Sequence, residues 1–442
     1  MSEPGSRRTN ARMSMHLRWC RPLLTLALLL ATPFAAYAQR ATGSTALGFA
    51  PDRLARVDKL LQQYVDSNRI GGAVGLVLRD GKVAYERSVG WSDKESGRRM
   101  SPDAIFRIAS QSKALTSVAV LMLVEEGRIA LGDPVSRFIP AYAHTVVASR
   151  ADSGRTVMPA KRQITIKDLL THTAGISYGT DAFVALQYSA KSLGPAAGWG
   201  WYTADKDEPI CATMERLATL PFVAQPGEAW VYGYNIDILG CVVERASGIA
   251  LDEFIRRRIT APLGMHDTYF FLPLSNRARL VTVYADSAGQ LRRAPAGPRG
   301  QGDYVDGPRK SFAGGAGLLS TAHDYARFLQ MLLNHGAMDG VRYLSPKMVD
   351  LMTTNQSGTL FGNAGQGFGL GFQTVEQLGA DGLASVGSFG WGGAYGSTYK
   401  VDPKEGLVIV FMINQLPTRT DVAAKFPTLV YQALVHARAG TR

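Results

Sequence analysis

The stretch that follows Ser110 constrains the fold most, because its residues are apolar nearly all round between positions 118 and 124. A helix without a polar face has to be surrounded by other elements. The stretch ends at Glu125-Glu126-Gly127, where a glycine suits the C-terminal cap of a helix. We therefore expect one central, buried helix, around which the remaining elements pack.

Strand patterns occur near both ends of the chain, while residues 130–345 have the character of helix and loop. This order favours an α+β fold, with one antiparallel sheet built from the two ends and a mainly helical lobe inserted between them. The pair Asp80-Gly81 between two strand-like runs is typical of a hairpin turn. The expected strands are 73–79, 82–89, 367–373, 397–401 and 407–412, and the expected helices include 52–68, 239–246, 251–259, 321–333 and 421–437.

The first 38 residues have the three parts of a secretory signal. Five arginines precede an apolar run at 22–34, and the small residues Ala36 and Ala38 follow it, so cleavage is expected after Ala38. The run is too short for a spanning helix, and we expect no stable membrane insertion after cleavage. The mature chain is therefore expected to be periplasmic or secreted, with an uncleaved anchor as the alternative.

The expected organisation is a signal peptide at 1–38, a linker at 39–51 and one folded domain at 52–437. Helices from the two ends of that domain would flank the antiparallel sheet. The α/β lobe would comprise about 52–130 and 345–437 and the helical lobe about 131–344, and a functional site is expected between the lobes.

Composition suits a globular enzyme, since the 442 residues are 46% hydrophobic and 19% charged. Loss of the signal, which holds five Arg and one Glu, lowers the formal net charge from +12 to +8. The basic residues are scattered, so we expect no nucleic-acid partner. Cys211 and Cys241 remain, either as a pair in an oxidising compartment or as two buried thiols. The oligomeric state stays open.

Lys113 follows Ser110 at the spacing that puts two side chains on one helix face, so the hydroxyl and the amine can meet. A serine with a base in reach can attack an acyl carbon. Two further segments accompany this pair. Tyr232 and Tyr234 stand just ahead of an apolar helix, and a glycine-rich run at 387–396 leads into a strand.

The order and spacing of these three motifs resemble the serine β-lactamase and penicillin-binding-protein superfamily, and more narrowly its class C-related branch, which includes the family VIII carboxylesterases. The resemblance covers about residues 52–437 and implies the β-lactamase/transpeptidase-like fold. It implies that Ser110 is the acylated nucleophile and Lys113 its base or the base's partner. Tyr232 would be the second proton-transfer residue, with its phenol held by Lys113, and the N–H groups of Ser110 and Ala394 would form the oxyanion hole.

Two departures from the β-lactamase pattern move the expectation towards ester hydrolysis. The Lys-Thr-Gly motif reads Trp391-Gly392-Gly393 here, and an indole offers no cation to a substrate carboxylate. The Tyr-x-Asn motif has Tyr234 in place of the asparagine. An aromatic wall suits an apolar acyl or alcohol group. The expected substrate-binding residues are Trp391, Gly392, Gly393, Tyr178 and Tyr234.

Other candidate groups have plainer interpretations. Ser177 lies in a G-x-S-x-G pattern, but the nucleophile elbow needs a strand before it and a helix after it, and here a helical stretch and a polar loop take those places. His172 is expected to be a structural hydrogen-bonding residue. The histidines lack metal-ligand spacing, so we expect no metal and no cofactor. Trp199, Trp201 and Tyr202 are equally compatible with a hydrophobic lid and with loop packing.

The sequence therefore predicts an exported serine hydrolase that cleaves small to medium apolar carboxylic esters through an acyl-Ser110 intermediate. A D-Ala-type peptidase or weak β-lactamase would use the same residues on a different substrate. A non-catalytic envelope protein that binds acyl ligands would reuse the fold without turnover. A transacylase with an acceptor other than water is not separated from a hydrolase by these residues.

Overall fold

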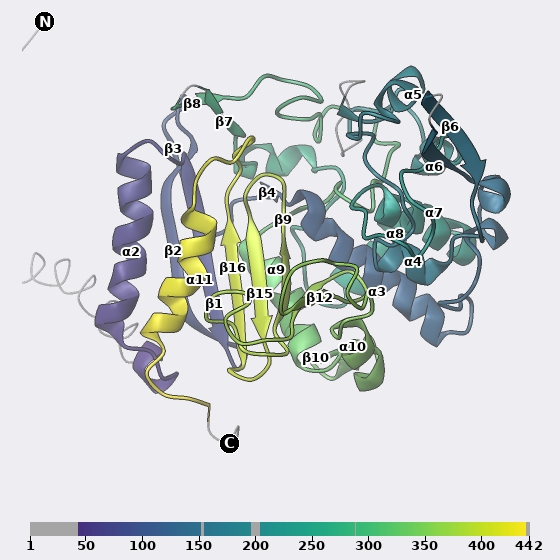
Figure 1. Cartoon of the computed structure of the whole chain (residues 1–442). Coiled ribbons are helices and arrows are strands. Elements are labelled where there is room, and N and C mark those ends of the chain that lie inside the picture. Colours follow the sequence, from purple (N-terminus) through teal and green to yellow (C-terminus); the bar gives the residue numbers. More distant parts are fainter. Residues whose placement is uncertain (1–42, 152–153, 196–203, 288, 439–442) are drawn as a thin grey trace, which may run out of the picture.

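An eight-stranded antiparallel sheet forms the centre of the protein, in a computed structural model that describes residues 43–151, 154–195, 204–287 and 289–438. Figure 1 shows helices α2 (Pro51–Asp66) and α11 (Val422–Ala433) side by side on one face of this sheet. The expected α+β architecture is confirmed. In sheet order the strands are β12 (Gln366–Phe368), β13 (Gln373–Val375), β14 (Phe389–Gly392), β15 (Thr398–Asp402), β16 (Leu407–Met412), β1 (Gly72–Arg79), β2 (Lys82–Asp93) and β3 (Arg98–Arg99).

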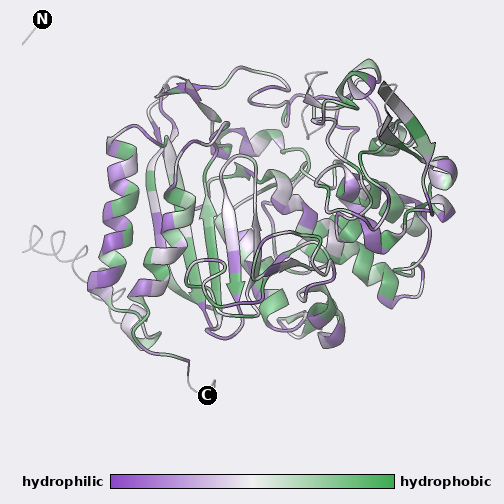
Figure 2. Ribbon diagram, viewed as in Figure 1, coloured by the Kyte–Doolittle hydropathy of each residue, from purple (hydrophilic) through white to green (hydrophobic). Residues whose placement is uncertain are grey.

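Strand β1 joins the two ends of the chain, since it pairs with β2 on one side and with β16 on the other. All its residues are buried, because both faces of the sheet are covered. Val74 and Leu76 belong to the core on the inner face, and Ala73 and Val77 belong to the core under α2 and α11 on the outer face. Figure 2 shows hydrophobic residues along β16 in the middle of the sheet, whereas hydrophilic and hydrophobic residues alternate along α2.

Helix α3 (Ser112–Glu125) is the central helix that the sequence predicts, and its residues up to Leu123 are all buried. It packs against α7 (Asn235–Ser247). Helix α9 (Ala322–Leu333) lies in the segment expected to form the helical lobe, yet it packs on the inner face of the sheet, with the Tyr325 and Tyr399 rings 5.1 Å apart.

Some expected elements are wrong in detail. Residues 367–373 form a hairpin of β12 and β13 instead of one strand, because Gly371 has φ +100° and a Cβ there would lie 2.4 Å from Ser117 Oγ. The last helix ends at Ala433, since Leu434 is extended and bridges to Phe49. Among the described residues, the middle of the chain also holds three hairpins that were not expected. They pair β5 (Val146–Ala151) with β6 (Gly154–Pro159), β7 (Tyr284–Ser287) with β8 (Gln290–Arg293), and β10 (Ala337–Met338) with β11 (Val341–Arg342).

A disulfide joins Cys211 on α6 (Ile210–Leu217) to Cys241 on α7, which decides between the two states that the sequence leaves open. The bond ties together two helices of the helical lobe, and the segment between them carries Tyr232. In the described part of the chain, none of the helices has both the length and the apolar character needed to cross a bilayer.

Replacing both Cys211 and Cys241 by serine is expected to lower the free energy of unfolding by about 3 kcal/mol, because the closed loop of 30 residues no longer restricts the unfolded chain. Denaturant unfolding of the double variant and the wild type measures this difference. An unchanged midpoint, with the wild-type bond verified by thiol titration, would contradict it.

Candidate active site

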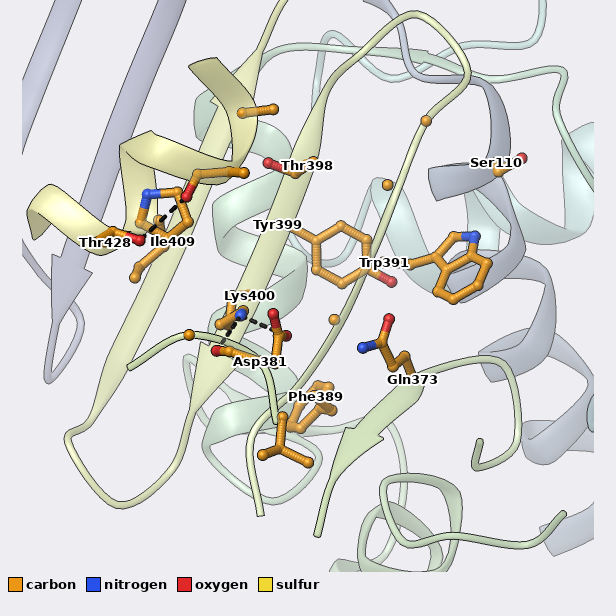
Figure 3. A pocket seen from close by; sticks show the side chains of 18 of the residues that line it. Ser110, Gln373, Asp381, Phe389, Trp391, Thr398, Tyr399, Lys400, Ile409 and Thr428 are labelled. Atoms are coloured by element: carbon orange, nitrogen blue, oxygen red, sulfur yellow. Dashed lines mark hydrogen bonds and ion pairs between the residues drawn. The ribbon is translucent and has the colours of Figure 1, made fainter. Parts of the chain in front are cut away.

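Ser110 lies in a short 3-10 turn, Ala109–Gln111, immediately before α3. Ala109 has φ +43°, in the left-handed region that non-glycine residues rarely adopt. Strained backbone of this kind concentrates at functional sites. The Ser110 side chain lines a cavity of about 980 Å³, and Figure 3 shows it on the same side of β14 as Trp391.

Lys113 lies in the first turn of α3 and is 1% exposed. Its Nζ is 3.2 Å from Ser110 Oγ, as the spacing in the sequence predicts. The same atom donates to Tyr178 OH at 2.9 Å and to the Gly315 carbonyl oxygen at 2.7 Å. These three oxygen partners supply the hydrogen bonds that a buried amine requires.

Tyr232 is not hydrogen-bonded to Lys113, which differs from what the resemblance implies. Lys113 Nζ lies over the Tyr232 ring, 4.7 Å from its centroid, as a cation–π contact. The phenol oxygen of Tyr232 instead accepts a hydrogen bond from Trp391 Nε1 at 3.0 Å. The lysine hydrogen-bonds the hydroxyl of Tyr178, and burial raises the pKa of Tyr178 well above its ordinary value, so this phenol stays protonated.

The expected substrate-binding residues divide into two groups. Trp391, Gly392, Gly393 and Tyr178 all line the cavity. Tyr234 lies behind them, 1% exposed, with its ring edge-to-face against Tyr178 at 4.7 Å and its hydroxyl accepting from the Gly194 N–H. Its physical role is therefore to support Tyr178, because the Tyr178 ring separates it from the cavity.

The end of β14 packs directly against the backbone that precedes Ser110. A Cβ at Gly393 would lie 2.5 Å from the Ile108 carbonyl oxygen, so only glycine permits this approach. The approach brings Ala394, whose N–H was expected to serve the oxyanion hole, to the wall of the cavity that holds Ser110. Two backbone donors at this place would face the oxygen of an acyl group bound to Ser110.

Asp237 and Gly315 are residues of this site that the sequence analysis missed. Asp237 is 1% exposed on α7, and its Oδ1 accepts the Gly315 N–H at 2.9 Å. The carbonyl oxygen of the same Gly315 accepts from Lys113. A Cβ at Gly315 would lie 2.4 Å from Asp237 Oδ2, so the Asp237 carboxyl group leaves room only for glycine at position 315. The sequence does contain a signal for this buried carboxyl group, because Asp237 stands between Ile236 and Ile238 in an apolar helix.

His172 and Ser177 lie close to the cleft in supporting positions. His172 Nδ1 is 2.9 Å from Asn235 Nδ2, and the imidazole lies 4.7 Å from the Tyr232 ring. Burial lowers the pKa of His172 well below its ordinary value, so the ring is neutral. Ser177 Oγ accepts the Gly179 N–H at 3.0 Å in a loop, without the strand and helix of a nucleophile elbow.

Two features considered from the sequence remain, the hydrophobic lid and the metal ligands. Trp199, Trp201 and Tyr202, considered for a hydrophobic lid, lie outside the described residues. Within the described ranges, no three His, Cys, Asp or Glu side chains come together in a group that could hold a metal ion.

Asp237→Asn tests the buried carboxylate. Burial raises the pKa of Asp237 to about 6, so the folded protein holds this proton more tightly than the unfolded chain does. The contribution of the carboxyl group to stability is therefore present below about pH 4 and is lost as the pH rises to about 6. The asparagine does not titrate. Relative to wild type, the variant should gain about 2 kcal/mol in unfolding free energy between about pH 4.5 and 7.5.

Denaturant unfolding at the two pH values measures this gain. The variant keeps an oxygen for the Gly315 N–H, so its overall fold should persist. If the difference in unfolding free energy between variant and wild type does not change with pH, the raised pKa of Asp237 is contradicted.

Trp391→Phe tests the hydrogen bond to Tyr232. It keeps an aromatic wall and removes the N–H at the phenol oxygen, so kcat should fall about tenfold, the effect of losing a hydrogen bond worth about 1.4 kcal/mol, with little change in KM. Tyr232→Phe removes the hydroxyl that is expected to transfer the proton and should lower kcat by about a hundredfold or more. Steady-state kinetics on an ester measure both. A full rate in Trp391→Phe, with the large loss in Tyr178→Phe instead, would transfer the role to Tyr178.

Comparison with known proteins identifies the family of the chain. The family model described as Beta-lactamase matches residues 57–433. Protein Rv1367c of Mycobacterium tuberculosis (strain ATCC 25618 / H37Rv) is 36% identical over 373 residues, which cover 81% of this chain and 89% of that protein. Esterase EstB of Burkholderia gladioli is 32% identical over 376 residues, covering 81% and 90%.

The fold is also similar to that of EstCE1, described as a hydrolase with promiscuous acyltransferase activity. The TM-score is 0.71 at 26% identity, over 87% of this chain and 98% of that structure. The family resemblance drawn from the Ser110, Tyr232 and Trp391 motifs is therefore confirmed. This chain belongs to the β-lactamase family and is a serine hydrolase of its esterase-like branch.

Proposed function

We propose that the protein is an exported esterase that hydrolyses uncharged, apolar carboxylic esters through an acyl-Ser110 intermediate. The observation that carries the proposal is the contact between Ser110 Oγ and Lys113 Nζ, at the wall of a cavity where Trp391 replaces the cationic residue that would recognise a carboxylate. The similarity to an esterase supports the same reaction class.

In the first step Ser110 Oγ attacks the ester carbonyl, and its proton passes to the basic group formed by Lys113 and Tyr232. The carbonyl oxygen becomes an oxyanion that the N–H groups of Ser110 and Ala394 stabilise. The intermediate collapses, the C–O bond to the alcohol breaks, and the leaving oxygen takes the proton back. Water then repeats the sequence on the acyl-serine and releases the acid.

The charge of the substrate follows from the residues around Ser110. Tyr178, Tyr232, Trp391 and Tyr399 supply aromatic surface to the cavity. Lys400, the one cationic side chain that lines the cavity among the described residues, is paired with Asp381 at 2.5 Å. An anionic substrate would therefore lose its hydrating water without gaining a cationic partner. An apolar ester carries no charge and does not have this cost.

Export is supported by the arginine-rich start, the apolar run and the Cys211–Cys241 disulfide, a bond that persists in oxidising compartments. The exported fraction should contain a chain that begins at Gln39. Recovery of the protein with an intact N-terminus inside the cytoplasm would contradict export.

Ser110→Ala and Ser177→Ala form a matched pair for the nucleophile. Ser110→Ala should abolish both ester turnover and covalent labelling by a fluorophosphonate, while Ser177→Ala should keep both, because its hydroxyl serves a loop hydrogen bond. Activity on p-nitrophenyl acetate and butyrate, compared with nitrocefin and a D-Ala-D-Ala peptide, measures the reaction. Labelling that persists in Ser110→Ala, or faster turnover of nitrocefin or the peptide, would overturn the proposal.

Acyl transfer to an alcohol is a second candidate, favoured by the acyltransferase activity named for EstCE1. The same acyl-serine would be resolved by an alcohol in place of water. Adding a primary alcohol to the assay and measuring new ester against free acid distinguishes the two. A transferase forms new ester as its main product, and a hydrolase forms acid.

A further inference from the structure

The cavity that contains Ser110 continues round the edge of the sheet onto its outer face. Side chains directly opposite each other in paired strands share a face. Trp391 pairs with Tyr399, which packs against α9 on the inner face. Gly392 pairs with Thr398, and Thr398 pairs with Phe411, whose ring contacts Phe426 of α11 on the outer face.

Residues of both faces line the same cavity. The cavity therefore passes round β14, and the pairing of β13 with β14 shows at which residues it does so. Among the described residues, β13 pairs with Phe389 and Gly390 of β14 and with no residue further along that strand. Trp391 and Gly392 consequently form a free edge next to Ser110. Figure 3 shows the lining residues on both sides of this edge, from Ser110 and Trp391 to Ile409 and Thr428.

The part of the cavity on the outer face exists because β14 has no side chains there. Gly390 and Gly392 take the outward positions, and a Cβ at Gly392 would lie no closer than 3.3 Å to its neighbours. Helix α11 forms the opposite wall with Ala423, Ala424, Pro427, Thr428 and Tyr431. We call this part the outer groove and define it by Gly390, Gly392, Thr398, Lys400, Ala424 and Thr428.

The charges beside the outer groove are already neutralised. Lys400 is paired with Asp381 at 2.5 Å. Asp421, at the start of α11, is paired with Lys425 at 2.6 Å and with Arg69 at 2.8 Å. Methyl, methylene and glycine surface remains for a ligand, and burial of an alkyl chain gains about 0.8 kcal/mol per methylene on such surface.

We propose that the outer groove binds the linear aliphatic chain of an ester whose carbonyl lies at Ser110. The proposal rests on the proposed function and extends its substrates from small and medium esters to long-chain ones. The chain crosses the free edge at Gly392, where no side chain stands in its way, and continues between β15 and α11.

Ala424→Trp tests the proposal, with Ala55→Trp as the control. Both alanines are exposed, on the neighbouring helices α11 and α2, but Ala424 lines the groove and Ala55 does not. The indole at position 424 should lower kcat/KM for p-nitrophenyl dodecanoate about tenfold, the loss expected for two displaced methylenes, and should change the value for the acetate less than about twofold. Ala55→Trp should leave both values unchanged.

A parallel series of n-alkyl acetates identifies which side of the ester carries the chain. A selective loss for long chains in either series supports the outer groove. Equal values for Ala424→Trp and wild type in both series, or equal losses for short and long chains, overturn it.

Binding of dodecanoate to Ser110→Ala separates the groove from the reaction. Titration calorimetry should detect binding to Ser110→Ala and at least tenfold weaker binding once Ala424→Trp is added, with the melting temperature unchanged. If the wild type hydrolyses no ester yet this difference holds, the proposed function is wrong and the groove assignment stands. Equal binding to both proteins overturns the groove assignment.

Discussion

The amine of Lys113 is the group on which the arrangement of the active site depends. A buried amine needs partners for its N–H groups, since transfer of an unpaired charge out of water is strongly unfavourable. Three oxygens satisfy it, from Ser110, Tyr178 and Gly315. Each comes from a different part of the chain. The lysine therefore has all three partners only when the start of α3, the loop of Tyr178 and the loop at residues 314–318 are in place.

The loop at residues 314–318 is held from two sides, and this places the Gly315 carbonyl oxygen next to Lys113. Thr116 of α3 donates to the Gly314 carbonyl, and the Leu318 N–H donates to Ser112 Oγ. Asp237 of α7 accepts the Gly315 N–H from the other side. The carboxyl group of Asp237 thereby acts on Lys113 through a single residue, Gly315, and the desolvation of that carboxyl group is the cost of the arrangement.

Local patterns were enough to predict the central helix, the sheet built from both chain ends and the meeting of Ser110 with Lys113, because each depends on helical or strand periodicity. The partner of the Tyr232 phenol was not predictable in the same way. Its choice of Trp391 over Lys113 depends on how β14 packs against the backbone before Ser110. The Asp237–Gly315 pair and the hairpin at residues 366–375 depend likewise on contacts between distant segments.

The role of Ser110 as nucleophile is tested most directly by the site of acylation during turnover. Wild-type protein is mixed with a p-nitrophenyl ester, quenched in acid within the first turnovers and digested, and the acyl group is located by peptide mass spectrometry. An acyl group should appear on Ser110 and disappear as the substrate is exhausted. An acyl group on Ser177 or on another residue, or rapid turnover without any acylated peptide, would contradict it.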